Sequence, residues 1–299
     1  MDAMIEGGCT ASYHLEAGFE VARTGGMTGL SPLETASVSP RKSLGQHFLV
    51  DQGALRRVVA AAEVGPDDVV VEVGPGTGLL TRLLVQQARR VVAVELDEAL
   101  VARLRESLGG FANLTVLHDD AREWDPATLG EPYKVVANLP YFAAIPIVRR
   151  FLECSLPPSL MAVTVQREVA QAMAASPGRM RLLSVAIQLY GRPRIMGYIR
   201  PGSFRPPPKV TSAILRLQVY PTPALALDDV DAFFRVVRAG FSASRKQLRN
   251  SLGHSFDVPG ARMEEVLLGA GIDPRLRAEA LGMEEWGILY AAVQREGLC

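Results

Sequence analysis

A regular alternation of apolar, β-branched runs with amphipathic segments is the feature that most limits how this chain can fold. The apolar runs cover residues 69–73, 90–95, 114–117, 134–138 and 160–166. The amphipathic segments, which have helical spacing, cover residues 79–88, 97–108, 144–153 and 167–175. Continuous apolar strands separated by helices are typical of a parallel sheet that helices cover on both faces. The sequence therefore predicts a doubly wound α/β domain.

The regions on either side of this alternation have different patterns. Residues 51–62 have helical spacing, and residues 194–199 and 213–219 fit a closing strand pair that makes the sheet mixed at one edge. After Pro221 and Pro223 the strand pattern stops. The segments that follow are predicted helices at 229–241, 246–252, 262–268 and 284–294.

These patterns predict three parts of the chain. Residues 1–40 mix Gly, Ser, Thr and short apolar pieces without a sustained period, and we expect an acidic, disordered extension there. Residues 41–222 form the α/β domain, and residues 223–299 form a small all-helical domain.

Composition excludes several classes of protein. No run approaches the roughly 20 apolar residues that a membrane-spanning helix needs. The N-terminus lacks the basic and then apolar pattern of a secretory signal. The three cysteines are odd in number and far apart, which fits neither a disulfide framework nor a zinc cluster. We therefore expect a cytoplasmic protein with no metal site and no membrane contact.

Charge is distributed unevenly along the chain. The 299 residues include 32 Lys plus Arg and 32 Asp plus Glu, so the formal charge is zero. Residues 1–40 hold five acids and one base, whereas residues 141–220 hold 11 bases and two acids, a net charge of plus nine. A solvated Arg-rich surface and a polyanion-binding site both explain such a stretch. Overall neutrality therefore does not exclude a nucleic-acid partner.

A glycine-rich turn follows the first strand of the α/β domain, in the sequence Glu72-Val-Gly-Pro-Gly-Thr-Gly78. Gly74, Gly76 and Gly78 let the backbone approach a ligand closely, and the helix that follows offers unpaired N–H groups. Doubly wound folds bind nucleotides at such turns. The spacing departs from the dinucleotide fingerprint, because Leu79 stands where the third glycine would be. Taken alone, the motif fits a nucleotide-binding loop or a tight structural turn.

Two acidic residues stand at the ends of the next two strands. Glu95, 21 residues after Gly74, is placed where a carboxylate can accept both ribose hydroxyls. Asp120 follows the third strand, where it can accept from an adenine amino group. Together with the glycine turn, these acids favour an adenosine ligand without phosphates. The sequence therefore predicts S-adenosylmethionine rather than NAD as the cofactor, with S-adenosylhomocysteine as its product.

The fourth strand ends in Asn138-Leu139-Pro140-Tyr141. The amide oxygen of Asn138 and the carbonyl of Leu139 or Pro140 can accept the two hydrogens of an exocyclic adenine amine and aim its lone pair at a methyl group. Tyr141 would stack on the base, since an aromatic face holds an unstacked base by about 1–3 kcal/mol. Catalysis would then depend mainly on proximity and orientation. A structural turn is the alternative for this tetrapeptide alone.

With these motifs in order, the chain resembles the KsgA-type (RsmA) small-subunit ribosomal RNA adenine dimethyltransferases. The resemblance rests on Arg41-Lys-Ser-Leu-Gly-Gln-His-Phe-Leu49, Glu72-Val-Gly-Pro-Gly-Thr-Gly78, Glu95-Leu-Asp97, Asp119-Asp-Ala121, Asn138-Leu-Pro-Tyr141, Gln166-Arg-Glu-Val-Ala170, Phe204-Arg-Pro-Pro-Pro-Lys-Val-Thr-Ser212 and Phe241-Ser-Ala-Ser-Arg-Lys-Gln-Leu-Arg-Asn-Ser-Leu252. It implies a Rossmann-like class I S-adenosylmethionine-dependent methyltransferase domain followed by a small all-helical domain that recognises RNA or the ribosome. It also implies N6,N6-dimethylation of two adjacent adenosines in the loop of the 3′-terminal helix of 16S rRNA, within the immature 30S subunit. We expect the free enzyme to be a monomer.

The resemblance also implies roles for single residues. His47 and Leu49 would contact the cofactor, and Asn138 would contact both the cofactor and the target amine. Tyr141 and Phe204 would sandwich the target adenine. Basic residues beside Phe204 and in the segment after Ser244 would bind RNA, namely Arg205, Lys209, Arg245, Lys246 and Arg249.

The chain departs from the family pattern at two places. The family usually has a polar Asn-Ile-Ser/Thr run after the tyrosine, whereas this chain has Phe142-Ala-Ala-Ile145. His47 replaces the usual asparagine. These changes alter the polarity of the pocket and a hydrogen bond to the cofactor.

Three other functions fit part of the pattern. Erythromycin-resistance methyltransferases modify one adenine of 23S rRNA on a related fold, but they typically have Asn-Ile-Pro-Tyr and lack the helix seen here from Ser244. Assembly or nucleic-acid-binding factors with dispensable catalysis would not need to retain Glu95, Asp120, Asn138 and Tyr141. A small-molecule methyltransferase would not explain the positive charge of residues 141–220.

Overall fold

The computed structural model describes residues 45–298. These residues belong to one compact unit, Val38–Cys299. The predicted extension over residues 1–40, and the beginning of the Arg41–Leu49 motif, lie outside the described residues. No helix in the described part is long and apolar enough to cross a membrane.

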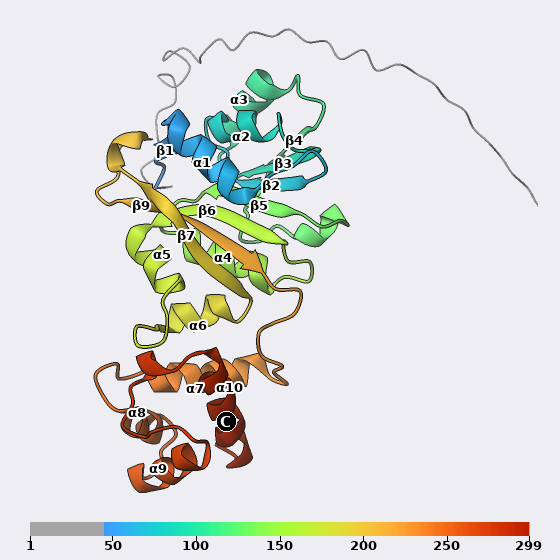
Figure 1. Ribbon diagram of the computed structural model, residues 1–299. Coiled ribbons are helices and arrows are strands. Elements are labelled where there is room, and N and C mark those ends of the chain that lie inside the picture. Colours follow the sequence, from blue (N-terminus) through green and yellow to red (C-terminus); the bar gives the residue numbers. More distant parts are fainter. Residues whose placement is uncertain (1–44, 299) are drawn as a thin grey trace, which may run out of the picture. The chain divides into compact units, whose positions relative to one another are not determined.

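A seven-stranded mixed sheet forms the centre of the α/β region (Figure 1), in the order β4-β3-β2-β5-β6-β9-β7. Its first five strands in this order are parallel, and β9 pairs antiparallel with both β6 and β7. This confirms the predicted parallel sheet with an antiparallel pair at one edge. The strands are β2 (Val69–Val73), β3 (Arg90–Glu95), β4 (Leu114–His118), β5 (Lys134–Asn138), β6 (Leu160–Gln166), β7 (Gly191–Ile199) and β9 (Ser212–Val219).

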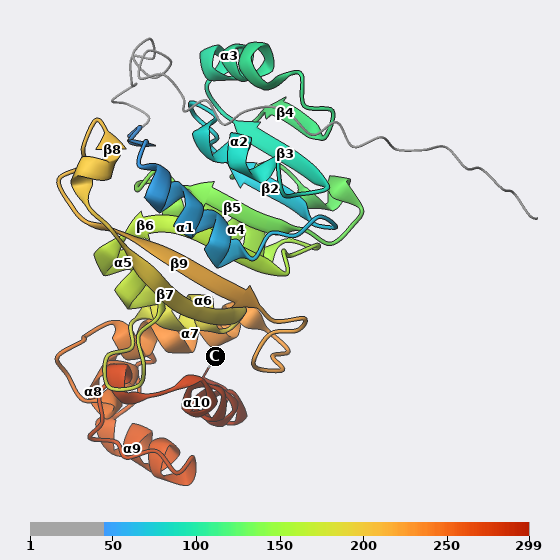
Figure 2. The same ribbon diagram turned by 45° about the horizontal axis from the view of Figure 1, so that its top comes forward.

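Helices cover both faces of this sheet, and the central strands are therefore buried on both sides (Figures 1 and 2). Val70 packs with residues of α1 and α2 in one cluster, whereas Val69 and Val71 pack with residues of α4 in another. The helices of this region are α1 (Gln52–Ala62), α2 (Leu79–Leu84), α3 (Glu98–Leu108), α4 (Ala144–Glu153), α5 (Arg167–Met173) and α6 (Leu182–Gln188).

Four helices follow the sheet, as the sequence predicts. They are α7 (Val230–Phe241), α8 (Leu248–Ser255), α9 (Gly260–Gly269) and α10 (Met283–Arg295). Phe233 of α7 and Trp286 of α10 are fully buried in their shared core. Val185 and Leu189, on and just after α6, belong to the same core although they precede residue 222. The division into domains at residue 222 stays a prediction.

Several helices differ from their predicted ranges by a few residues, and α2 and α8 are the clearest cases. α2 ends at Leu84 instead of residue 88, since the chain turns there to reach β3. α8 begins at Leu248 instead of residue 246, because the Leu248 N–H donates to the carbonyl of Leu276 at 2.7 Å. That tertiary hydrogen bond satisfies one of the first N–H groups of the helix.

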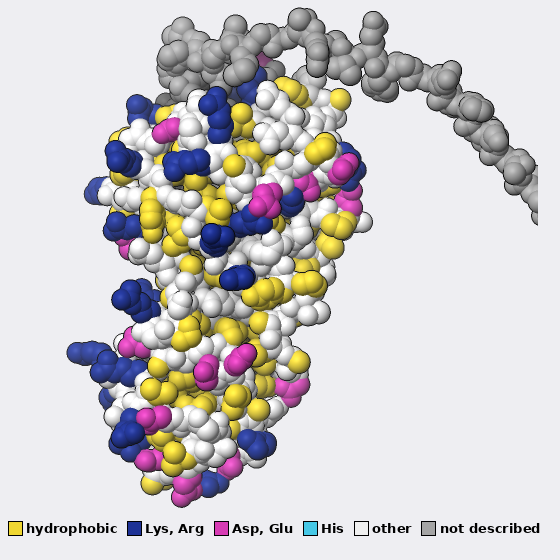
Figure 3. All heavy atoms as spheres, in the orientation of Figure 1, with side chains coloured by type: hydrophobic (Ala, Val, Ile, Leu, Met, Phe, Trp, Pro, Cys, Tyr) yellow, Lys and Arg dark blue, Asp and Glu magenta, His cyan; other side chains and the backbone are white. Residues whose placement is uncertain are grey.

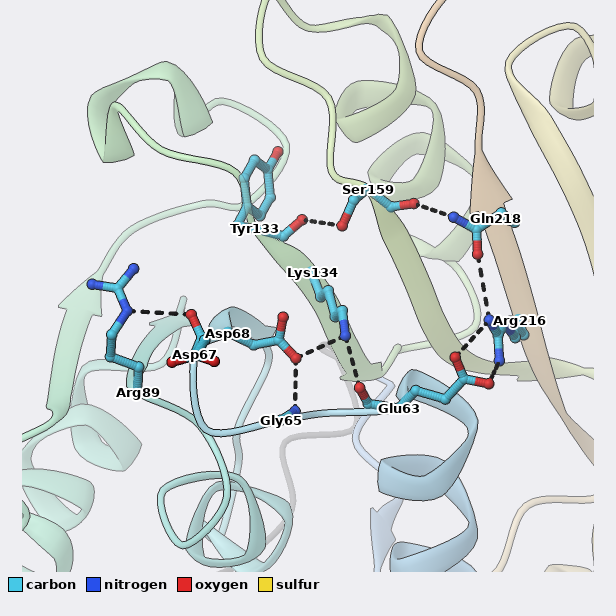
Figure 4. A network of polar contacts seen from close by, with 10 residues as sticks. All are labelled: Glu63, Gly65, Asp67, Asp68, Arg89, Tyr133, Lys134, Ser159, Arg216 and Gln218. Atoms are coloured by element: carbon cyan, nitrogen blue, oxygen red, sulfur yellow. Dashed lines mark hydrogen bonds and ion pairs between the residues drawn. The ribbon is translucent and has the colours of Figure 1, made fainter.

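A polar network connects the strand ends at the side of the sheet where β2, β5 and β6 begin (Figure 4). Lys134 Nζ donates to Asp68 Oδ2 and to the Glu63 carbonyl, both at 2.7 Å. The Glu63 carboxylate in turn pairs with Arg216 of β9. The network therefore fixes strands of both halves of the sheet where the parallel strands begin. The opposite side, where the parallel strands end, is left for a ligand.

Candidate active site

One cavity of about 210 Å³ lies where the parallel strands end. Its predicted lining residues come from six motifs that are separate in the sequence. The predicted residues that line it are His47, Gly74, Gly76, Glu95, Asp120, Asn138, Leu139, Pro140, Tyr141 and Phe204. Gly78 and Leu49 are not among its lining residues.

The three glycines of the turn have different surroundings. A Cβ on Gly74 would meet nothing within 4 Å, so the backbone there is open to a ligand. Gly76 has a φ of +58°, and a Cβ would lie 2.9 Å from the Phe48 ring. A Cβ on Gly78 would lie 2.8 Å from Leu104 of α3. Gly78 therefore permits close packing of the turn against α3 and does not face the cavity.

Glu95 holds the glycine turn in place from the end of β3. Its Oε2 accepts from the Gly76 N–H and its Oε1 accepts from the Asp97 N–H, both at 3.0 Å. Burial raises the pKa of the Glu95 carboxyl, and the two backbone N–H groups counteract part of that rise. Each carboxylate oxygen keeps a further lone pair, so Glu95 can still accept hydrogen bonds from hydroxyl groups in the cavity.

Asp120 lies at the cavity with a cationic neighbour that the sequence pattern did not reveal. Arg122 Nε donates to Asp120 Oδ1 at 2.9 Å, and a second guanidinium nitrogen pairs with Oδ2. The Arg122 hydrogen bonds hold the pKa of Asp120 below its usual range. Asp120 is therefore an ionised acceptor, oriented by an arginine that also lines the cavity.

The carboxamide of Asn138 is fixed by two hydrogen bonds. Its Nδ2 donates to the His47 carbonyl at 2.9 Å, and its Oδ1 accepts from Thr164 Oγ1 at 2.5 Å. Thr164 lies opposite Asn138 on the neighbouring strand and is fully buried. With its amide nitrogen donating to His47, Asn138 presents its oxygen as an acceptor.

The two predicted stacking residues have different neighbours. The Tyr141 hydroxyl lies 2.6 Å from Ser212 Oγ, and its ring stacks on His47 with centroids 5.7 Å apart. Burial raises the pKa of the Tyr141 hydroxyl. Phe204 is only 1% exposed and packs in the α1 core, although it also lines the cavity. The proposed sandwich of the target adenine between these rings stays a prediction.

A two-residue ladder joins the segment before α1 to the Phe204 loop. β1 (Phe48–Leu49) pairs antiparallel with β8 (Phe204–Arg205), and the register places Leu49 opposite Phe204. His47 Nδ1 also lies 2.7 Å from the Pro206 carbonyl oxygen. The sequence indicated the importance of both segments but gave no sign that they pair.

A second, smaller cavity of about 20 Å³ lies behind the glycine turn. It is lined by Leu49, Gly74 and Asn138, and by Glu72 of β2. Glu72 is 1% exposed, and neither of its carboxylate oxygens has a hydrogen-bond partner. Burial, assisted by the nearby Glu95 charge, raises the pKa of Glu72 to about 8, although Thr81 opposes the rise. Glu72 is therefore a carboxyl that the fold keeps protonated at neutral pH.

Replacement of Glu72 by glutamine is expected to change how stability depends on pH. The unfolded carboxyl ionises above about 4.5, and the folded one only near 8. The contribution of this pKa difference to the free energy of unfolding is thus fully present below pH 4.5. It is lost as the pH rises toward 8, at about 1.4 kcal/mol per pH unit. In urea denaturation at pH 5, 6, 7 and 8, the free energy of unfolding of Glu72→Gln should increase relative to that of the wild type at each step. A difference between the two proteins that is independent of pH would contradict this assignment.

The predicted RNA-binding residues are exposed to different degrees and differ in their contacts. Lys209, Arg245 and Lys246 are exposed and make no ion pair with any residue of the described part of the chain. Arg205 donates to backbone carbonyls of its own loop. Arg249, by contrast, pairs with Glu264 at 2.6 Å. In Figure 3, many Lys and Arg side chains lie on the left of the molecule, where Figure 1 labels β9 and α5.

Known proteins match this chain over most of its length. The family model described as ribosomal RNA adenine dimethylase matches residues 38–290. A Dehalococcoides mccartyi protein named ribosomal RNA small subunit methyltransferase A is 43% identical over 258 residues, which make up 85% of this chain and 88% of that protein. A Moorella thermoacetica protein of the same name is 42% identical over 268 residues, 85% of this chain and 93% of that protein.

Solved structures also have this fold. The crystal structure of the 23S rRNA methyltransferase ErmE superposes with a TM-score of 0.68 and 30% identity, covering 83% of this chain and 99% of that chain. A dimethyladenosine transferase from Plasmodium falciparum gives a TM-score of 0.71 at 24% identity, covering 84% and 98%. The second likeness supports the fold alone.

Proposed function

The chain belongs to the ribosomal RNA adenine dimethylase family, and we propose that it dimethylates the N6 amines of two adjacent adenosines in the 3′-terminal helix of small-subunit rRNA. The observation that carries the proposal is a single cavity that holds the Asn138 turn beside the glycine turn and Glu95. The proposed acceptor of the amine, in the Asn138 turn, thus lies next to the residues proposed to bind an adenosine. The relatives named small subunit methyltransferase A support the choice of subunit.

The cavity suits S-adenosylmethionine, which when bound supplies an electrophilic methyl group on its sulfonium. Open backbone at Gly74 leaves room for the methionine part. Glu95 has lone pairs free for the two ribose hydroxyls, and the ionised Asp120 can accept from the adenine amine. No phosphate-binding residue is needed for such a ligand.

Asn138 would accept one hydrogen of the target amine, and the carbonyl of Leu139 or Pro140 would accept the other. Thr164 keeps the Asn138 oxygen in place before the target arrives, so little reorganisation is needed. His47 covers one face of the Tyr141 ring, which leaves the other face for the target base. These residues hold the amine and orient its lone pair, and no unusual general base is required.

A parallel assay of both ribosomal subunits tests the proposal. Small and large subunits that lack the modification are incubated with the protein and S-adenosylmethionine, and rRNA fragments are weighed by mass spectrometry. We expect a gain of two methyl groups on each of two adjacent adenosines of the small subunit. A gain on 23S rRNA alone would favour the activity of ErmE, and no gain on either subunit would favour an assembly factor without catalysis.

The proposal extends to location and assembly state. An immature 30S subunit as partner implies that the protein works in the cytoplasm, during late subunit assembly. We also propose that the free enzyme is a monomer, which sedimentation equilibrium tests directly.

Arg245 and Lys246 are expected to contact RNA phosphates, because they are exposed and free of ion pairs with the described residues. Replacing both by alanine should weaken RNA binding and reduce the slope of log K against log salt by about two. Arg262→Gln, on α9, is a matched control, because its guanidinium is already paired with Glu265 and Glu296. Binding measured from low to high salt checks both variants. An unchanged slope in the double variant would remove this turn from the interface.

A further inference from the structure

Phe142 is a large apolar residue that the protein leaves open at the mouth of the cavity. It is 59% exposed and lines the cavity. It directly follows Tyr141 in the turn between β5 and α4. The Tyr141 hydroxyl reaches inward to the buried Ser212, whereas Phe142 stays in contact with solvent. Of these two successive rings, Tyr141 therefore belongs to the wall of the cavity and Phe142 to its rim.

The backbone of Gly45 holds the Phe142 ring in position. A Cβ on Gly45 would lie 3.0 Å from Cδ1 and 3.3 Å from Cε1 of Phe142, so the ring packs directly on this glycine. Gly45 also has a φ of +56°, which a larger residue would adopt only with strain. The ring is therefore supported on one side and open on the other.

The aromatic character of Phe142 separates it from Leu96, the other exposed apolar side chain at the cavity. Among the exposed large hydrophobic residues of the described chain, Leu96 and Phe142 line the cavity. Only Phe142 of these two has a π-face. A base can stack on such a face whatever its sequence, because every base has a π-face of its own.

We propose that Phe142 is the stacking platform for the nucleobase next to the adenosine that occupies the cavity. A nucleotide that enters the cavity must leave its stack, and its neighbour then loses one stacking partner. The open face of Phe142, one residue from Tyr141, replaces that partner at the cavity mouth. This inference rests on the proposed function, because it requires an RNA whose target base is drawn out of its stack.

The alternative role of Phe142 is to cover the cofactor, and two variants separate the roles. Phe142→Leu keeps an apolar side chain against Gly45 but has no π-face, and Phe142→Trp keeps the π-face. We expect Phe142→Leu to lower kcat/KM for unmodified small subunits by roughly tenfold, mainly through KM. Phe142→Trp should stay within about threefold of the wild type. Affinity for S-adenosylhomocysteine, measured by calorimetry, should be unchanged in both.

A fluorescent base reports the stacking directly. The probe is a hairpin RNA with two adjacent loop adenosines, of which one is replaced by 2-aminopurine, whose emission is quenched by stacking. Binding at low salt should quench the probe base with the wild type and with Phe142→Trp, and less with Phe142→Leu. Leu268→Ala, which removes a 60% exposed side chain on α9, is the control and should match the wild type.

Two results would overturn the proposal. One is a Phe142→Leu variant with wild-type kcat/KM and wild-type quenching. The other is a loss of S-adenosylhomocysteine affinity as large as the loss of RNA affinity, which would make Phe142 a cover for the cofactor. If the wild type methylates neither subunit, the proposed function fails, and the quenching of the hairpin probe still decides whether Phe142 stacks on RNA.

Discussion

Replacement of Asn138 by alanine should lower kcat for methyl transfer by about 100- to 1,000-fold, the usual loss when one preorganised polar group of an active site is removed. The variant would lose the proposed acceptor of the target amine, Asn138 Oδ1, which Thr164 Oγ1 holds with a 2.5 Å hydrogen bond. RNA binding should change little, because most affinity for nucleic acid comes from phosphate contacts. Single-turnover methylation and RNA binding, measured on the same preparation, give the two numbers.

Thr164→Val is the matched control for this experiment. Valine has the shape of threonine without the hydroxyl, so Asn138 remains present but loses the partner of its Oδ1. We expect a smaller loss of kcat than in Asn138→Ala, with the fold intact by circular dichroism. If Asn138→Ala instead loses RNA binding and methyl transfer equally, Asn138 maintains the structure of the turn and has no direct part in transfer.

Replacement of Glu95 by alanine should weaken cofactor binding by about 100-fold or more. Two hydrogen bonds from ribose hydroxyls to a buried carboxylate would be lost, and bonds to charged groups are worth about 1.5–3 kcal/mol each. The Gly76 N–H would lose its partner as well, which loosens the glycine turn. Titration calorimetry with S-adenosylhomocysteine measures the loss without requiring turnover.

The affinity for the cofactor should also fall at acid pH through Glu95. Burial raises the pKa of Glu95, so its carboxylate is protonated at a higher pH than an ordinary glutamate. The ionised acceptor is fully present above that raised pKa and is lost as the pH falls through it. Glu95→Gln should abolish this step, whereas Asp119→Asn, an acid at the same cavity, should retain it. A step that persists in Glu95→Gln would assign it to another group.

Strand positions were predictable because the central strands are buried on both faces. β2, β3, β5 and β6 match the predicted ranges, since a run such as residues 91–94 of β3 is apolar on both faces of the sheet. The meeting of Glu95, Asp120 and Asn138 followed from the same rule, because parallel strands end at one edge. The sheet and the location of the cavity could therefore be inferred without coordinates.

Other contacts could not be predicted because they join segments with no shared pattern. The pairing of Phe48 with Arg205 links residues more than 150 positions apart through only two residues per strand. Thr164 stands in an apolar run, and only the register with β5 reveals that its hydroxyl meets Asn138. α6 is too short to have a clear helical period, so its role in the C-terminal core was missed.

The β1–β8 ladder and His47 connect the Phe204 loop to the Asn138 turn. His47 connects three parts at once: its carbonyl accepts from Asn138, its ring stacks on Tyr141, and its Nδ1 meets the Pro206 carbonyl oxygen. A movement of the Phe204 loop on contact with RNA would therefore shift His47 and, through it, Asn138. Any factor by which RNA tightens cofactor binding must equal the factor by which the cofactor tightens RNA binding. If the ladder transmits this movement, RNA and cofactor are heterotropic effectors of each other.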